Sequence, residues 1–261
     1  MNTFIFISNR LSKIIGNICK ILAYPFHFLF PNKRFIIPEF SNVKIKIKNK
    51  HKIPKIIWQT NYSNRSTLPV YLNYLFNRLM SLDYEYHYVS TEERLIFIEK
   101  HCSDEIFQNF KLLIDGAAQA DLWRLIVLYY KGGVYLDIDA NFVWPLAKML
   151  NIDADAVYLK IKNNTEFTNY FIATAPNNKN IELMIHLIIS NIKNRKIDGG
   201  VYNMTGPGVL NAILKNKDVI SRIHRETCIQ GSFTNEYFQY LDKPGTKWTH
   251  KKNSELLKEK K

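Results

Sequence analysis

Cysteine is scarce in this 261-residue sequence, where Cys19, Cys102 and Cys228 lie far apart. Three widely separated cysteines form neither an even-numbered disulfide framework nor the close pairs typical of a zinc site. The scarcity therefore favours a reducing compartment. Apolar residues make up 46% of the chain, which is enough for the core of one large domain.

Acidic residues are nearly absent from the two ends of the chain. Residues 1–55 contain 11 Lys or Arg and one acid, Glu39, and residues 243–261 contain seven Lys and two Glu. The region 56–242 is close to neutral, so the net charge of +13 belongs to the ends. Basic ends fit an anionic surface such as a membrane or nucleic acid, and they also fit solubilising tails. Because recognised nucleic-acid motifs are absent, we expect no nucleic-acid partner.

The sequence also lacks an uninterrupted apolar run long enough to span a bilayer. The most apolar stretch, Ile14–Phe30, is interrupted by Lys20, Pro25 and His27. No small-residue cleavage site follows it, so a secretory signal is not expected. An amphipathic helix at an anionic membrane surface fits this stretch best, and predicts a cytoplasmic protein peripheral to the inner face of the membrane. An uncleaved signal anchor and an ordinary helix packed on the domain are the alternatives.

Strand and helix patterns alternate through the middle of the chain. Apolar runs and alternating patterns predict strands at 53–61, 84–90, 133–142, 156–161 and 169–175. Helical spacing predicts helices at 68–82, 91–101, 117–131 and 178–195, and a short one at 145–150. The lysine-rich alternation at 43–52 suits either an edge strand or a basic linker. The pattern predicts an α/β sandwich around a largely parallel sheet over 53–242, between a basic apolar segment (1–52) and a basic tail (243–261).

Two carboxylates interrupt the apolar strand pattern in GGVYLDIDANF, Gly132–Phe142. Because side chains alternate along a strand, Tyr135, Asp137 and Asp139 should share one face. Like charges this close need a cation between them or solvent around them. Ligands of open α/β sheets bind beyond the carboxyl ends of the strands, where Mg²⁺ or Mn²⁺ takes one or two carboxylates together with substrate phosphates. Alone, the spacing is weak evidence, and a solvated strand end fits it better than a metal site does.

A second charged pair precedes this strand. Asp121 and Arg124 are three residues apart in a helical pattern, so they share a face. The sequence Lys-Gly-Gly then ends the helix and returns the chain directly into the Asp-bearing strand, which would bring both pairs to one cleft. Arg124 suits a diphosphate or a sugar hydroxyl, and Asp121 suits hydroxyl groups. The alternative is a surface ion pair worth at most about 1 kcal/mol.

Three stretches together resemble glycosyltransferase family 32, a family of DXD sugar-binding enzymes. They are IPKIIWQT at 53–60, AAQADLWRLIVLYYKGGVYLDIDANF at 117–142 and TGPGVL at 205–210. The resemblance implies a GT-A fold, a UDP- or GDP-linked sugar donor, a Mn²⁺ or Mg²⁺ ion and retention of anomeric configuration. The family includes initiating mannosyltransferases and bacterial capsule and lipooligosaccharide transferases, so a hexose or N-acetylhexosamine and a surface-glycan or lipid-linked acceptor are implied.

The resemblance also implies roles for single residues. Asp137 would face the ribose and the metal's water shell, and Asp139 would bind the metal directly. Asp121 and Arg124 would hold the donor sugar and its phosphate side. Further donor contacts would come from Trp58, Gln59, Thr60, Tyr135, Thr205, Gly206 and Pro207.

A third metal ligand is expected near the C-terminus. Family members often supply a His or Ser in a His-x-x-x-Ser-Trp context, and His250 and Ser254 have that spacing here. Glu255 occupies the place of the Trp, so the match is partial. A lone histidine in a lysine-rich tail also suits an exposed side chain.

Two other classes compete with the transferase. VYLDIDANF also resembles the Asp-x-Asp-x-Thr of haloacid-dehalogenase-like phosphatases, but Asn141 replaces the Thr and the motif lies mid-chain. The second alternative is a non-catalytic membrane-surface binding protein, which the basic ends favour.

Overall fold

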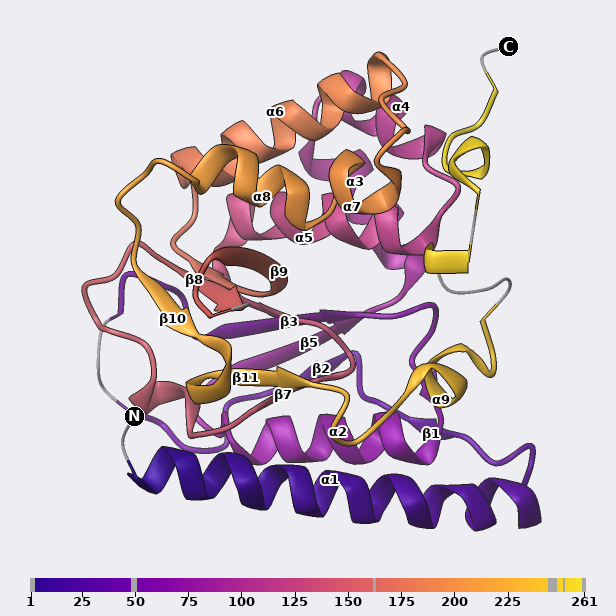
Figure 1. The fold of residues 1–261 in the computed structure, drawn as a ribbon, viewed down its shortest axis with the longest axis vertical. Helices are drawn as coiled ribbons and strands as arrows, with labels where there is room; N and C mark the ends of the chain where they lie inside the picture. Colours follow the sequence, from indigo (N-terminus) through magenta and orange to yellow (C-terminus); the bar gives the residue numbers. More distant parts are fainter. Residues whose placement is uncertain (1–2, 48–50, 162, 244–247, 251, 260–261) are drawn as a thin grey trace.

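A seven-stranded sheet lies at the centre of the computed structural model, which describes residues 3–47, 51–161, 163–243, 248–250 and 252–259 (Figure 1). The strand order is β10-β8-β9-β6-β3-β5-β2. In chain order these strands are β2 Phe40–Ser41, β3 Ile56–Thr60, β5 Glu85–Val89, β6 Gly133–Leu136, β8 Ala156–Ile161, β9 Glu166–Thr174 and β10 Ser221–Ile223. Five of them run in one direction, while β9 and β2 run the opposite way. The predicted α/β fold with a largely parallel sheet is confirmed.

Helices cover both faces of the sheet. Helices α5 and α6 lie on one face and α1 and α2 on the other (Figure 1). The longer helices are α1 Thr3–Leu29, α2 Leu68–Leu79, α3 Thr91–His101, α4 Asp104–Leu112, α5 Gly116–Lys131, α6 Lys179–Lys193 and α8 Pro207–Leu214. The short ones are α7 Gly200–Met204, α9 Glu236–Tyr240 and the 3₁₀ turns Leu146–Lys148, His224–Glu226, Trp248–His250 and Asn253–Glu255. Two small antiparallel sheets pair β1 Phe35–Ile36 with β4 Arg65–Ser66, and β7 Ala140–Phe142 with β11 Cys228–Gln230.

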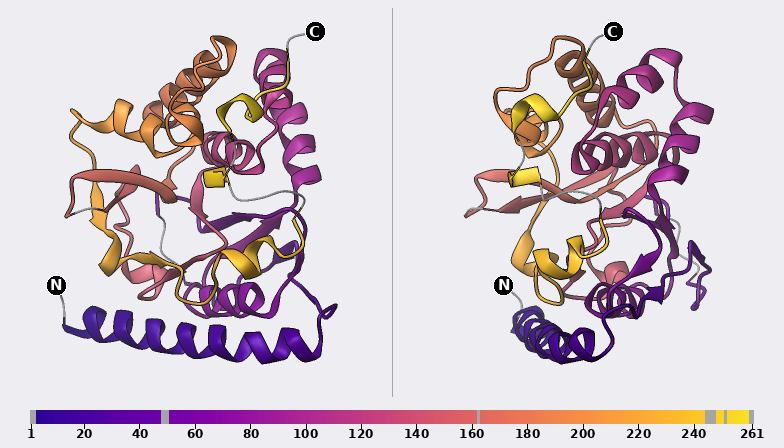
Figure 2. Two further views of the ribbon diagram at one scale, coloured as in Figure 1. Left: turned by 45° about the vertical axis from the view of Figure 1, so that its right-hand side comes forward. Right: turned by 90° about the vertical axis from the view of Figure 1, so that its right-hand side faces the viewer.

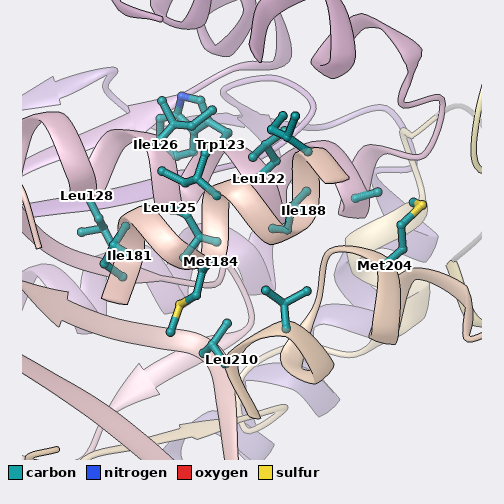
Figure 3. Close-up of a cluster of buried hydrophobic side chains, with 14 of the residues drawn as sticks. Leu122, Trp123, Leu125, Ile126, Leu128, Ile181, Met184, Ile188, Met204 and Leu210 are labelled. Atoms are coloured by element: carbon teal, nitrogen blue, oxygen red, sulfur yellow. The ribbon is translucent and has the colours of Figure 1, made fainter. Parts of the chain in front are cut away.

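The larger apolar core fixes α5 between α6 and the sheet. Figure 3 shows side chains of α5 meeting those of α6 and of the segments that follow it. The labelled residues are Leu122, Trp123, Leu125, Ile126, Leu128, Ile181, Met184, Ile188, Met204 and Leu210. Each buried aliphatic side chain contributes about 1.5–3 kcal/mol, so this packing holds α5 firmly over the strands.

Glycine sets the sharp turn from α5 into β6. Gly132 has φ of 65° and Gly133 has φ of 105°, a region that side chains with a Cβ rarely adopt. A Cβ on Gly133 would also lie 2.6 Å from the Ile56 carbonyl oxygen. Asp115 begins α5 by accepting hydrogen bonds from the Ala117 and Ala118 amides at 2.8 and 3.1 Å. The first turns of α5 are thereby placed beyond the carboxyl end of β6.

The strand expected to carry both carboxylates is shorter than the sequence pattern predicts. β6 ends at Leu136, and residues 137–139 form a turn in which the Ala140 amide donates to the Asp137 carbonyl at 3.0 Å. The chain turns here because it leaves β9, its partner in the large sheet, and pairs with β11 instead. The two carboxylates therefore project from a turn and not from one strand face.

Both end segments, 1–52 and 243–261, contain residues that pack on the central domain. Within the segment 1–52, α1 lies along α2 and β2 joins the large sheet (Figure 2). In the tail, Leu256 and Leu257 are buried in the main core. Residues 43–47 form no strand, which fits the linker alternative, while 48–50 lie outside the described residues. Among the described helices, none combines the length and apolar character that crossing a bilayer requires.

Candidate active site

A cavity of about 600 Å³ lies beyond the carboxyl ends of β3 and β6. Its position follows from the fold, because ligand sites of open α/β sheets form at this edge. Polar and charged side chains dominate its lining. They include Thr60, Asn61, Tyr62, Thr91, Arg94, Asp115, Gln119, Asp121, Arg124, Tyr135, Asp137, Asp139, Thr168, Asn169, Tyr170, Tyr202, Gln230, Gln239, Tyr240 and Lys243.

Arg124 joins the two predicted acidic groups. Its Nη2 lies 2.7 Å from Asp121 Oδ1, and its Nη1 lies 3.3 Å from Asp137 Oδ1. The Arg124 and Asp121 side chains are only 5% and 7% exposed, while that of Asp137 is 26% exposed. Because Arg124 and Asp121 are buried, they do not form the surface ion pair that was the alternative. The sequence correctly predicts that these residues meet in one cleft.

Both oxygens of the Asp121 carboxylate accept hydrogen bonds from neighbouring side chains. Asn169 Nδ2 donates to Oδ1 at 2.9 Å and Thr205 Oγ1 donates to Oδ2 at 3.0 Å. Burial raises the pKa of Asp121 to about 6, while Arg124 and the two donors act in the opposite direction. The carboxylate is therefore oriented on both sides before any ligand binds.

Tyr135 contacts both Asp137 and Arg124. Its hydroxyl donates to Asp137 Oδ1 at 2.7 Å, and the Arg124 guanidinium carbon lies 4.4 Å from the centre of its ring. Burial raises the pKa of Tyr135 well above its usual value, so the phenol is the donor in this pair. Tyr135 is thus a positioning residue for Asp137 and Arg124.

Asp139 and Asp137 share a neighbour, the side-chain amide of Gln230. Gln230 Nε2 donates to Asp139 Oδ1 at 3.0 Å and lies 3.5 Å from Asp137 Oδ2, so one amide group touches both carboxylates. Gln239 Nε2 lies 3.5 Å from Asp139 Oδ2. Burial, and then the charge of Asp137, raise the pKa of Asp139 to about 6.

This pair fits a hard divalent cation. The two carboxylates converge on one amide, and their mutual repulsion is what a cation between them would relieve. Among the residues that the structure describes, no group of three or more His, Cys, Asp or Glu could hold a metal. Mg²⁺ and Mn²⁺ commonly need only one or two carboxylates when substrate phosphates complete the shell, so the pair is a sufficient protein contribution.

The structure does not bring His250 to this pair. Its Nε2 lies 3.0 Å from Glu236 Oε1, the side chain is 59% exposed, and it is not part of the cavity lining. A third metal ligand from the C-terminal tail stays a prediction.

The expected donor contacts divide into two groups. Thr60 and Pro207 line the cavity, as Tyr135 does. Trp58, Gln59, Thr205 and Gly206 do not line it.

Trp58 points away from the cavity because its ring completes the core. Its Nε1 donates to the Gly132 carbonyl at 2.9 Å, and its ring stacks on His87 at 4.5 Å. The expectation that Trp58 meets the nucleotide is corrected by this placement: it supports the end of α5 instead. Gln59 has a similar task, since its Nε2 donates to the Asp137 carbonyl at 3.1 Å and fixes the turn.

Several cavity residues have no signal in the sequence. Asn169 is read as an ordinary strand residue, and Gln230 and Gln239 stand in stretches without a motif. Asn169 reaches Asp121 from β9, and Gln230 reaches Asp139 because β11 pairs with β7. Gln239 reaches Asp139 from α9.

Two further cations, Arg94 and Lys243, line the cavity. Arg94 is 3% exposed, and its Nη2 donates to Thr91 Oγ1 at 2.8 Å. Burial lowers the pKa of Lys243 to about 8, against the attraction of Asp139. The cavity lining therefore contains cations that could attract an anion as well as carboxylates that could hold a cation.

The comparison with protein families decides what kind of site this is. Residues 69–171 match the family described as "Glycosyltransferase sugar-binding region containing DXD motif". This segment is therefore similar to the sugar-binding region of DXD-type glycosyltransferases. The match includes α5, β6 and the turn at Asp137–Asp139, and it confirms both the resemblance seen in the sequence and the enzyme class.

A curated relative of this chain is the "Initiation-specific alpha-1,6-mannosyltransferase" of Candida albicans. It is 25% identical over 133 residues, which cover 46% of this chain and 34% of the relative. The matched part therefore spans about a third of the length of that relative.

Two solved structures resemble the fold. "PaToxG Glycosyltransferase" is 21% identical and has a TM-score of 0.47, covering 80% of this chain and 78% of that one. The UDP-bound glycosyltransferase domain of the YGT toxin is 14% identical and has a TM-score of 0.39, covering 62% and 56%. The fold class itself rests on the sheet order described above.

Proposed function

We propose that this protein is a metal-dependent retaining glycosyltransferase. It moves a hexose or N-acetylhexosamine from a UDP- or GDP-linked donor to a surface-glycan or lipid-linked acceptor. The observation that supports this most is Arg124, which lies between Asp121 and Asp137 at the wall of a cavity that also contains Asp139. A sugar diphosphate needs all three features: a cation for phosphate, an acceptor for sugar hydroxyls and carboxylates for a metal.

Each charged group has a separate task in this proposal. Asp121, oriented by Asn169 and Thr205, accepts hydrogen bonds from hydroxyl groups of the donor sugar. Arg124 donates to the phosphate side of the donor while it keeps its contact with Asp121. Asp137 and Asp139 hold Mn²⁺ or Mg²⁺. When bound, that ion supplies positive charge to the diphosphate that leaves with the bond electrons.

Retention is proposed to follow from attack on the same face of the sugar. A double displacement needs a protein nucleophile, and the acidic groups at the sugar side are committed: Asp121 is held by three partners, and Asp137 accepts from Tyr135. In a same-face mechanism the leaving phosphate helps to take the proton of the acceptor hydroxyl. A trapped covalent glycosyl-enzyme would contradict this part of the proposal.

The acceptor and the location follow from the same proposal. Capsule or lipopolysaccharide assembly would present a glycan or glycolipid at the inner face of the membrane, where a cytoplasmic peripheral protein could reach it. The mannosyl transfer in the description of the Candida relative makes GDP-mannose one donor to test.

The test is a screen of nucleotide-sugars for donor hydrolysis in the presence of Mn²⁺ or Mg²⁺. The panel contains UDP-glucose, UDP-galactose, UDP-N-acetylglucosamine and GDP-mannose. We expect one donor to be hydrolysed with release of nucleoside diphosphate, and a chelator to stop the reaction. Release of phosphate from a generic phosphomonoester, with no turnover of any nucleotide-sugar, would favour a phosphatase instead.

A further inference from the structure

Helix α1 packs on the domain with its polar and small residues. Asn9, Ser12, Gly16, Ala23 and His27 are its buried residues. A Cβ is not tolerated at Gly16 without movement, because it would lie 2.8 Å from the backbone carbon of Ser232. Surface helices of globular proteins normally bury their apolar face. Helix α1 does the reverse, because the face that it buries is polar or small.

The opposite face of α1 is apolar and exposed. Large side chains recur at intervals of three and four residues from Phe4 through Ile7 to Ile21, and Phe28 follows seven residues later, which places them in one stripe. Their exposed fractions are 71% for Phe4, 52% for Leu11, 55% for Ile14, 52% for Ile18, 65% for Ile21 and 85% for Phe28. The stripe is widened by Ile15, Leu22 and Leu29. An apolar surface that runs the length of such a helix marks an interaction site.

Contacts spread along α1 hold it flat against the domain (Figure 2). Near its start, Ser8 Oγ donates to the Val143 carbonyl at 2.5 Å. In the middle, Lys20 Nζ donates to the Gly231 carbonyl at 2.8 Å. Near its end, His27 Nε2 accepts from the Leu68 amide at 3.1 Å, at the start of α2. The helix thus presents its apolar stripe sideways and not end-on.

Charge indicates what covers this stripe. Residues 3–29 contain Arg10, Lys13 and Lys20 and no acid. Burial, and then the charges of Arg225 and Lys13, lower the pKa of His224. Cations beside an apolar stripe complement a surface that is apolar inside and anionic at its edge. A second copy of α1 would offer further cations and no acid for them to pair with.

We propose that α1 lies in the plane of a lipid bilayer with anionic headgroups, with its apolar stripe inserted and Arg10 and Lys13 at the headgroups. The helix is about 40 Å long at 1.5 Å per residue, so it forms an extended contact line. The proposal deepens the proposed function and rests on it for the nature of the acceptor.

The surface connects directly to the active site. Tyr24 accepts a hydrogen bond from Asn235 Nδ2 at 2.6 Å and packs against Phe238 at 4.8 Å. Asn235 and Phe238 belong to the start of α9, which contributes Gln239 and Tyr240 to the cavity. A membrane that contacts α1 therefore lies one segment away from the cavity, which suits a lipid-linked acceptor.

Flotation of the full-length protein with vesicles tests the proposal. One vesicle is phosphatidylcholine alone, and the other contains about one third phosphatidylglycerol. We expect the wild-type protein to float with the anionic vesicles and about tenfold less with the neutral ones. Ile14→Glu/Ile21→Glu should reduce binding to anionic vesicles at least about tenfold, because two inserted side chains become charged. The matched control, Ile96→Glu/Leu183→Glu, changes residues that are 62% and 44% exposed elsewhere and should float as the wild type does.

Three results would overturn the proposal. They are equal flotation with both vesicles, flotation of the α1 variant at the wild-type level, and a lipid-free dimer that the α1 variant abolishes. Hydrolysis of a soluble donor is measured on the same variants and should be unchanged. If the α1 variant loses flotation but no donor is hydrolysed by any form, the membrane surface stands and the transferase proposal fails.

Discussion

Thr205 and Asp121 are separated by 84 positions in the sequence, yet Thr205 Oγ1 donates to Asp121 Oδ2 at 3.0 Å. Both side chains are buried, and Thr205 does not line the cavity. The sequence Thr-Gly-Pro therefore acts from behind the cavity: its Thr orients a carboxylate, and only its Pro207 borders the cavity.

Thr205→Val should lower kcat/KM for donor hydrolysis. The change keeps the shape of the side chain but leaves a buried carboxylate oxygen without its donor, which costs about 1.5–3 kcal/mol for a bond to a charged group. We expect a loss of about tenfold or more, together with a lower melting temperature. Thr205→Ser keeps the hydroxyl and should retain most of both. Unchanged kcat/KM in Thr205→Val would show that Asp121 does not depend on this bond.

Trp58→Phe separates a structural role from donor binding. The variant loses the 2.9 Å bond from Nε1 to the Gly132 carbonyl at the end of α5. We expect about 1 kcal/mol less stability by denaturant unfolding and little change in the KM for the donor. A large increase in that KM with unchanged stability would instead mean that Trp58 contacts the nucleotide.

The sequence predicts those parts of the site whose residues lie close together along the chain. Asp121, Arg124, Asp137 and Asp139 lie within 19 residues, and the helix, the Gly-Gly turn and the strand that join them all have local signals. The limits predicted for α3 are confirmed for the same reason, because Ser90 and Glu93 form the capping box that begins this helix. Helices α4 and α8 were not predicted.

Long-range pairing could not be predicted in this way. Gln230 reaches Asp139 only through the pairing of β11 with β7, which ends β6 at Leu136 and turns the two aspartates out of the strand. The packing of α1 through its polar and small residues is also a tertiary effect. The sequence shows one apolar stripe on this helix, and only the fold shows that the stripe faces outward.

The pH profile of donor hydrolysis should have an acid limb near pH 6. Burial raises the pKa of both Asp121 and Asp139 to about 6 from an ordinary value of 3.8. As the pH falls through about 6, both carboxylates take up protons, and the protonated forms can neither pair with Arg124 nor hold a cation. We expect kcat/KM at a metal concentration below saturation to fall below about pH 6 with a slope greater than one proton, because protons compete with the cation for the carboxylates. A profile that stays flat down to about pH 4.5 would show that these groups ionise like exposed aspartates.

The central claim is that the carboxylates at Asp137 and Asp139 hold the metal on which donor cleavage depends. The most direct measurement is the Mn²⁺ dependence of donor hydrolysis in the wild type, in Asp139→Asn and in the matched control Asp153→Asn, whose side chain is exposed away from the cavity. We predict that Asp153→Asn follows the wild-type curve, and that Asp139→Asn loses turnover by orders of magnitude while its thermal unfolding stays cooperative. Wild-type turnover that survives complete chelation, or equal turnover in Asp139→Asn, would contradict the account.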